Sequence, residues 1–247
     1  MLGDDSMKPV IGVPLRYTRM ADGRPILYLG ERVRRTLQKA GAEVFVISPV
    51  QDVDYMDTKG NEFLELTLEE KALIHKNLSC CDGLFFPGGV KITPYDRYLL
   101  EVAIEEKIPI LAVCLGMQMM SCYLEEVKLE ANHSDILHHQ GSDNDSLVHE
   151  VVIDKNSKLY QIIGKDKIMV NSFHNYHATD NQVYRTVARS LDGQVEALEY
   201  PGDTFNIGVQ WHPEISYMFD DNSKKIIDTF IQNAKNKSVE KEVLGTL

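Results

Sequence analysis

The stretch Ile108-Pro-Ile-Leu-Ala-Val-Cys-Leu-Gly116 joins a short apolar run to the start of a helical pattern. An uncharged run of this length is typical of a strand that is buried on both faces of a sheet. The helical spacing of apolar residues then continues over 115–124. Because the same pairing of strand and helix recurs through the first half of the chain, the sequence predicts a mostly parallel sheet with helices on both faces.

Strands and helices are expected to alternate before this stretch, and mostly shorter strands are expected after it. Before it, we expect strands at 8–14, 43–47 and 83–86, and helices at 28–40, 68–78 and 95–107. After it, a polar segment at 132–146 precedes shorter strands at 148–153, 167–171, 183–189, 194–200 and 206–210, and a helix at 222–235. The later strands are expected to extend the sheet in antiparallel fashion.

Length and composition predict one domain over 7–237, with a leader at 1–6 and a charged tail at 238–247. The formal net charge is -11, and Lys and Arg are scattered, so nucleic acid is not an expected partner. No window is apolar enough to span a membrane, and no signal peptide is evident. The four cysteines show no disulfide or metal spacing, which favours a reducing cytoplasm.

Cys114 is the candidate nucleophile because it lies where the apolar run meets the helical pattern. The small residues Ala112 and Gly116 flank it, as a sharp nucleophile elbow requires. The positive end of the helix dipole would favour the thiolate over the thiol. From this segment alone, a buried structural cysteine is an equally good interpretation.

His212 is the candidate base, within Val209-Gln-Trp-His-Pro-Glu214. Glu214 lies two residues away, where its carboxylate could orient the imidazole to accept the thiol proton. Without that neighbouring acid, an ordinary histidine at a strand end would be the better interpretation. Pro87-Gly88-Gly89 also follows a buried strand, and its backbone N–H groups could face an oxyanion, although such a turn is weak evidence by itself.

Three ordered motifs resemble the class I glutamine amidotransferase superfamily: Phe86-Pro-Gly-Gly89, Cys114-Leu-Gly-Met-Gln118 and Gly208-Val-Gln-Trp-His-Pro-Glu214. Within it, Val170-Asn-Ser-Phe-His174 and Val195-Glu-Ala-Leu-Glu199 are similar to the γ-glutamyl-γ-aminobutyrate hydrolase group, peptidase family C26. The resemblance implies a flavodoxin-like, three-layer α/β domain. It runs from about the first strand to the last helix.

The resemblance also implies roles for individual residues. Cys114 would be the nucleophile, His212 the base and Glu214 its orienting partner, and the backbone of Gly89 and Leu115 would bind the oxyanion. A γ-glutamyl thioester would form on the cysteine, and no metal or organic cofactor is implied. The implied substrate-binding residues are Gly88, Gln118, Asn171, Ser172 and His174; for Asn171 and His174, ordering a turn is an equal alternative.

The chain departs from the hydrolase pattern at several positions. Leu115 replaces the usual arginine of that group and is instead usual in synthase-linked glutaminase domains. Asn175-Tyr176 replaces the usual His-Gln, Ala112 replaces a common glycine, and the segment after Gly89 is short. The identity of the amine side of the substrate therefore stays open, and so does the oligomeric state, with a homodimer as one option.

Four histidines in the polar segment and beside it match no zinc pattern: His133, His138, His139 and His149. A solvated loop, which could act as a lid, is the preferred interpretation.

Three functions remain open from the sequence. The first is a stand-alone cysteine hydrolase of glutamine or other small-molecule γ-glutamyl amides. The second is a glutaminase subunit that supplies ammonia to a separate synthase, which the Cys114-Leu-Gly116 motif favours. The third is a member of the superfamily that binds a γ-glutamyl ligand or a partner without catalysis.

Overall fold

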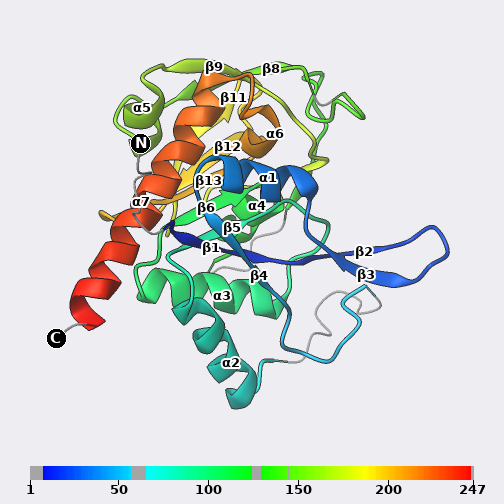
Figure 1. Ribbon diagram of the computed structural model, residues 1–247. Coiled ribbons are helices and arrows are strands. Elements are labelled where there is room, and N and C mark those ends of the chain that lie inside the picture. Colours follow the sequence, from blue (N-terminus) through cyan, green and yellow to red (C-terminus); the bar gives the residue numbers. More distant parts are fainter. Residues whose placement is uncertain (1–7, 57–64, 124–128, 144, 246–247) are drawn as a thin grey trace.

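The computed structural model describes residues 8–56, 65–123, 129–143 and 145–245, and its centre is a nine-stranded sheet (Figure 1). The strand order is β4-β1-β5-β6-β13-β12-β11-β8-β9. The predicted leader at 1–6 lies outside the described residues. The α/β class and the helices on both faces confirm the fold predicted from the sequence.

The first five strands in this order run parallel, and the last four extend the sheet antiparallel, as predicted. The parallel strands are β4 (Glu43–Ile47), β1 (Val10–Pro14), β5 (Gly83–Phe86), β6 (Ile110–Val113) and β13 (Asn206–Val209). The antiparallel strands are β12 (Val195–Glu199), β11 (Arg185–Ser190), β8 (His149–Ile153) and β9 (Lys167–Val170).

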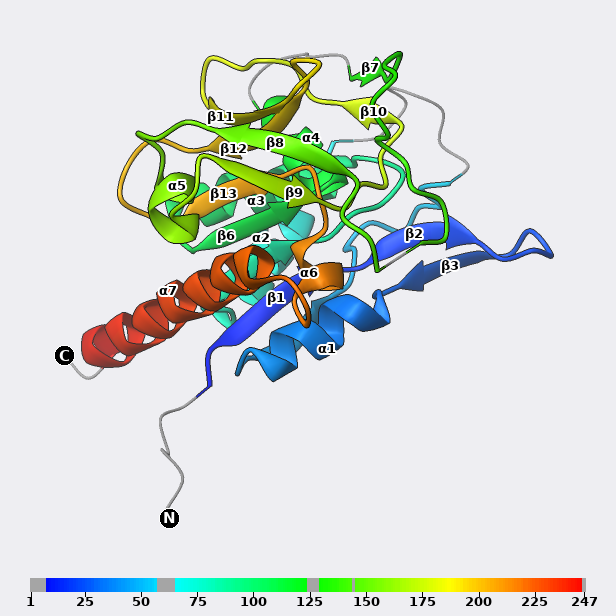
Figure 2. The same ribbon diagram turned by 90° about the horizontal axis from the view of Figure 1, so that it is seen from above.

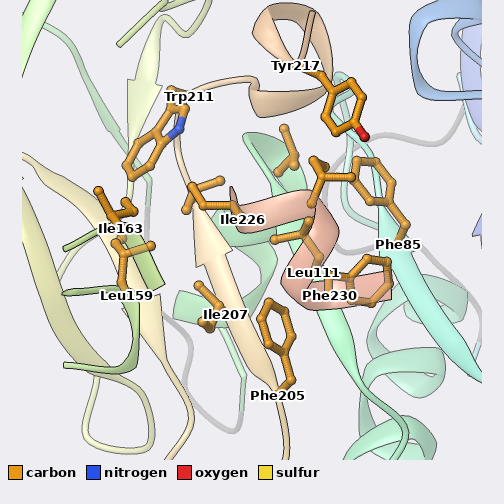
Figure 3. Packing of buried hydrophobic residues seen from close by; sticks show 14 of the residues in the cluster. Phe85, Leu111, Leu159, Ile163, Phe205, Ile207, Trp211, Tyr217, Ile226 and Phe230 are labelled. Atoms are coloured by element: carbon orange, nitrogen blue, oxygen red, sulfur yellow. The ribbon is translucent and has the colours of Figure 1, made fainter. Parts of the chain in front are cut away.

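Two apolar cores cover the two faces of the sheet. One contains side chains from α1 (Glu31–Lys39), α5 (Lys158–Ile163) and α7 (Asp221–Gly245), and Figure 3 shows its centre around Trp211, Ile226 and Phe230. The other contains side chains from α2 (Leu68–Ser79), α3 (Pro94–Glu105) and α4 (Leu115–Ser121). Alternation along β5 explains the division, since Phe85 joins the first core and Phe86 the second.

Helices α2 and α3 each begin at a capping residue that can be recognised in the sequence. Thr67 accepts from the backbone N–H of Glu70, whose side chain accepts from the backbone of Thr67 in return. Thr93 and Asp96 form the same reciprocal cap, with Pro94 at the first helical turn. Each cap satisfies two backbone donors that a helix start otherwise leaves unpaired.

Several elements differ from the sequence prediction. A hairpin of β2 (Arg16–Arg19) and β3 (Pro25–Tyr28) precedes α1, which begins at Glu31 rather than at the predicted residue 28. The turn uses Gly23 at a φ of 86°, a conformation that glycine adopts without strain. Short elements that the sequence did not reveal are α5, α6 (Pro213–Ser216) and the two-residue pair β7 (Glu130–Ala131) and β10 (Tyr176–His177).

The last helix is longer than the predicted 222–235, because α7 continues to Gly245. The predicted boundary at 237 therefore lies inside a helix. Lys241 secures the extension by donating to the carbonyl of Cys81 and by lying 3.4 Å from the Asp82 carboxylate. Figure 2 shows this helix projecting beyond the sheet at its C-terminal end.

Two further properties of the structure concern membrane-spanning helices and disulfide bonds. None of the helices in the described part of the chain is long and apolar enough to cross a membrane. All four cysteines are free thiols.

Candidate active site

The candidate residues converge because they follow three neighbouring parallel strands. Gly88 and Gly89 come after β5, Cys114 comes after β6, and His212 comes shortly after β13. These three strands are adjacent in the sheet order. Since parallel strands end at the same edge, segments far apart in the sequence meet at the carboxyl edge of the sheet, where α/β proteins commonly form their sites.

Cys114 has a strained backbone, with φ 52° and ψ -108°. A non-glycine residue in such a region costs about 1–3 kcal/mol, so the surrounding structure must hold it there. It does so by two backbone hydrogen bonds: the N–H of Cys114 donates to Val209, and its carbonyl accepts from Gln118. Gly116 permits the turn, because a Cβ there would lie 2.6 Å from the Phe86 carbonyl oxygen. The predicted elbow is therefore present in the backbone.

His212 is held on both sides of its ring and along its backbone. Its Nδ1 lies 2.7 Å from Glu214 Oε1, and its ring also interacts with the Cys114 thiol. The Asn171 amide accepts from the N–H of His212 and donates to its carbonyl, at 2.8 and 2.9 Å. Burial lowers the pKa of His212, but Glu214 and Cys114 outweigh burial and raise that pKa to about 10. This arrangement can hold a proton between the thiol and the carboxylate.

The glycine turn after β5 lies against both candidate groups. A Cβ on Gly88 would come 2.9 Å from His212 Cε1 and 3.5 Å from Cys114 Cβ. A Cβ on Gly89 would come 3.0 Å from the Leu115 side chain. Leu115 begins α4, so its N–H has no partner within the helix. Gly89 and Leu115, which carry the two predicted oxyanion donors, are thus close together in space. The binding of an oxyanion by their N–H groups stays a prediction.

Arg16 supports this turn and was not identified from the sequence. Its guanidinium donates to the Pro87 carbonyl at 3.1 and 2.9 Å and to Asp96 at 2.6 Å. Both side chains of the ion pair are buried. No sequence signal links the partners, because Arg16 and Asp96 are 80 positions apart.

The side chains of the predicted substrate-binding residues after β9 and on α4 are buried and bonded to the protein. Gln118 donates to the Tyr176 carbonyl and to the Gln210 amide oxygen, at 2.7 and 3.2 Å. Ser172 donates to the His138 carbonyl at 2.7 Å, and Asn171 holds His212. These contacts give the residues positioning roles, and their contact with substrate remains a prediction.

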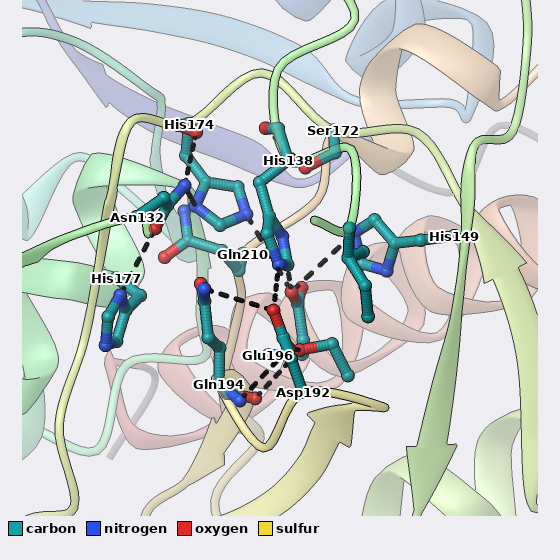
Figure 4. Close-up of polar contacts among 12 residues, drawn as sticks. Asn132, His138, His149, Ser172, His174, His177, Asp192, Gln194, Glu196 and Gln210 are labelled. Carbon is teal, nitrogen blue, oxygen red and sulfur yellow. Dashed lines mark hydrogen bonds and ion pairs between the residues drawn. The ribbon is translucent and has the colours of Figure 1, made fainter. Parts of the chain in front are cut away.

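The interpretation of the histidine-rich segment as a solvated loop is wrong for two of its four histidines. His133 and His139 are exposed, but His138 and His149 are 3% and 5% exposed. They lie with His174 and Glu196 in a buried group that we call the three-histidine cluster (Figure 4). Sequence spacing missed it because its members come from a loop, from β8, from the segment after β9 and from β12.

Comparisons with known proteins agree with this fold and with the motifs. A sequence model of the peptidase C26 family matches residues 95–214. A protein of Schizosaccharomyces pombe named as a candidate glutamine amidotransferase is 33% identical over 181 residues, which cover 62% of this chain and 70% of that protein. The γ-glutamyl-γ-aminobutyrate hydrolase PuuD of Escherichia coli is 28% identical over 207 residues, covering 72% of this chain and 81% of the hydrolase.

A solved structure extends the likeness across the whole chain. A protein from Thermoplasma acidophilum, described as a candidate GMP synthase subunit, superposes with a TM-score of 0.62 at 16% identity. The alignment covers 96% of this chain and 98% of the archaeal protein. At this identity the likeness establishes the fold alone.

Proposed function

The chain belongs to the peptidase C26 family of glutamine amidotransferase-like proteins, and we propose that it hydrolyses γ-glutamyl amides with Cys114 as the nucleophile. The observation that carries the proposal is the meeting of Cys114, His212 and Glu214 at one edge of the sheet. The proposed substrate class comes from the family and from the similar E. coli protein, which is named as a γ-glutamyl-γ-aminobutyrate hydrolase.

The first half of the proposed reaction forms a thioester. The Cys114 thiolate attacks the γ-carbonyl carbon, and the oxygen gains negative charge as the carbon becomes tetrahedral. Backbone N–H groups of Gly89 and Leu115 would donate to this oxygen. The protonated His212 ring gives its proton to the leaving nitrogen, the C–N bond breaks, and the amine departs.

The second half returns the enzyme to its starting state. Neutral His212 takes a proton from water as the water attacks the thioester carbonyl. The carbon–sulfur bond breaks, glutamate leaves, and Cys114 is again a thiolate beside a protonated imidazole. Glu214 stabilises the imidazolium throughout and fixes its orientation.

Glutamate release from a substrate panel tests the proposal. The purified protein is given glutamine and γ-glutamyl derivatives of several amines, and glutamate is measured with time. We expect turnover of at least one γ-glutamyl amide. The absence of both turnover and a covalent adduct with a glutamine-mimicking electrophile would contradict catalysis and favour a binding protein.

A synthase-linked glutaminase is the second candidate, because Leu115 follows the cysteine and the superposed structure is described as part of a synthase. Such a protein would release glutamate from glutamine, slowly when alone, and would not process other γ-glutamyl amides. Co-purification with a synthase, together with faster glutamine hydrolysis in the complex, would distinguish it from the stand-alone hydrolase.

A Gly88→Ala substitution is expected to lower kcat/KM for γ-glutamyl amides by about 100-fold, because the new methyl group would displace the His212 ring from Cys114. Gly30→Ala is the matched control, since its Cβ would meet Val33 at an ordinary 3.7 Å. Initial rates of both variants are compared with those of the unaltered protein. Equal rates for Gly88→Ala would show that this turn does not limit the site.

A further inference from the structure

The three-histidine cluster has the geometry of a metal site. His138 Nδ1, His149 Nε2 and His174 Nε2 lie 3.5, 3.6 and 3.8 Å from Glu196 Oε1. These separations are too long for good N–H···O hydrogen bonds. They are at or slightly above the edges of a coordination tetrahedron, which are about 3.3–3.6 Å when a metal lies about 2.0–2.2 Å from each ligand. The four ligand atoms all lie within 4.8 Å of one another, so binding would draw the rings inward.

The atoms that face one another in the cluster are buried without hydrogen-bond partners. Among the described residues, none bonds to the three facing imidazole nitrogens or to either oxygen of Glu196. The four side chains are at most 4% exposed. Since buried polar atoms are nearly always paired, five such atoms facing one another indicate a site for a bound ligand.

The outer nitrogens of the three rings are hydrogen-bonded in the way that metal-binding histidines require. His138 Nε2 lies 2.9 Å from an Asp192 oxygen. His149 Nδ1 and His174 Nδ1 lie 3.3 and 3.0 Å from the backbone carbonyls of Glu150 and Tyr176. A proton on each outer nitrogen would leave the inner nitrogen with a free lone pair. Figure 4 shows the three labelled rings grouped around Glu196.

The charges in the cluster also favour a cation. Burial lowers the pKa of His149, and it lowers that of His174 to about 4, so both rings are neutral and can act as ligands near pH 7. Burial raises the pKa of the Glu196 carboxyl to about 7, although the rings of His149 and His138 act in the opposite direction. A divalent cation at the centre of the cluster would stabilise the carboxylate.

We propose that the three-histidine cluster binds one Zn²⁺ ion through three imidazole nitrogens and one carboxylate. Zinc suits this donor set, and four protein ligands without an open position are typical of a structural rather than a catalytic site. No spacing of residues along the chain predicts this metal. The inference is independent of the proposed hydrolysis, because metal binding is measured without substrate.

The bound ion would join strands β12 and β8 of the sheet to the loops beside the candidate active site. Glu196 is on β12 and His149 on β8, whereas His138 and His174 lie in loops that bond to each other through backbone atoms. His174 is three residues after Asn171, which holds the backbone of His212. Zinc would therefore fix the segment that positions the candidate base.

Zinc content of the untagged, full-length protein tests this proposal. After gel filtration in metal-free buffer, mass spectrometry of the elements should find about one zinc per chain. Removal with a chelator should lower Tm by about 5 °C or more, and stoichiometric Zn²⁺ should restore it. Replacement by Co²⁺ should give the intense visible absorption of a tetrahedral site.

Two variants make the test specific. Glu196→Gln, which keeps the side-chain shape, should bind zinc at least about 100-fold more weakly in competition with a chelator. His139→Ala removes an exposed histidine of the same loop and should keep the metal. A folded protein that binds neither Zn²⁺ nor Co²⁺, or a Co²⁺ spectrum unchanged in Glu196→Gln, would overturn the assignment.

Discussion

Replacement of Cys114 with alanine is expected to reduce the hydrolysis of γ-glutamyl amides by about 10⁴-fold or more. Without the thiol, no thioester can form, and His212 and the backbone donors can assist only a direct attack by water. The fold should persist, because alanine keeps the Cβ atom and the backbone hydrogen bonds of the elbow. The measurement is the initial rate of glutamate release, with circular dichroism to verify folding.

Cys80→Ala is the matched control for this variant, since Cys80 is the exposed cysteine of the four. It should retain full activity, and a glutamine-mimicking electrophile should still modify it once, at Cys114. Undiminished turnover by a folded Cys114→Ala protein would mean that another group is the nucleophile.

Replacement of Glu214 with glutamine is expected to lower kcat by roughly 10²–10⁴-fold at neutral pH. A neutral amide cannot stabilise the imidazolium, and its NH₂ group can present a donor to Nδ1 in place of an acceptor. The 2.7 Å contact that orients the ring is then lost. Steady-state kinetics of the folded variant provide the test.

The pH profile of Glu214→Gln separates loss of charge from general damage. In the unaltered protein the pKa of His212 is about 10, above its ordinary 6.5, so the ring stays protonated and able to give its proton between these values. The contribution of the His212–Glu214 pair to the stability of the folded protein is fully present below pH 6.5. It is lost as the pH rises through about 10. In the variant, the pH at which kcat falls on the alkaline side should move from about 10 toward 6.5, the ordinary pKa of histidine. An unmoved fall would show that Glu214 does not set the pKa of His212.

Much of the fold could be predicted from the sequence because its signals are local. The apolar run before Cys114 is buried at every position of β6, and buried strands of this kind alternate with helices in the parallel half. The hairpin of β2 and β3 was missed because each strand has only four residues, and β2, with the sequence Arg-Tyr-Thr-Arg, lacks the apolar pattern of a core strand. The short helix α5 was missed because six residues hold too little periodicity.

The residues of the candidate site also divide into those with a local sequence signal and those without one. Cys114, His212 and the glycine turn were identified because each lies directly at or just after a strand end, in a motif of contiguous residues. Arg16 and the three-histidine cluster depend on pairs from distant parts of the chain, which one sequence cannot reveal. Glu196 illustrates the limit: the sequence placed it in a family motif, but only the fold shows that it is buried beside three imidazole rings.

The position of β13 affects how the protein is made. This strand lies between β6 and β12, although it is the last strand of the sheet to leave the ribosome. Until then β6 keeps one edge unpaired, and exposed edges of apolar strands invite association between unfinished chains. The thiol that follows β6 also has no imidazole beside it during that time. An incomplete chain is therefore vulnerable to aggregation, and the proposed reaction at Cys114 can begin only when the segment that contains β13 and His212 has been inserted.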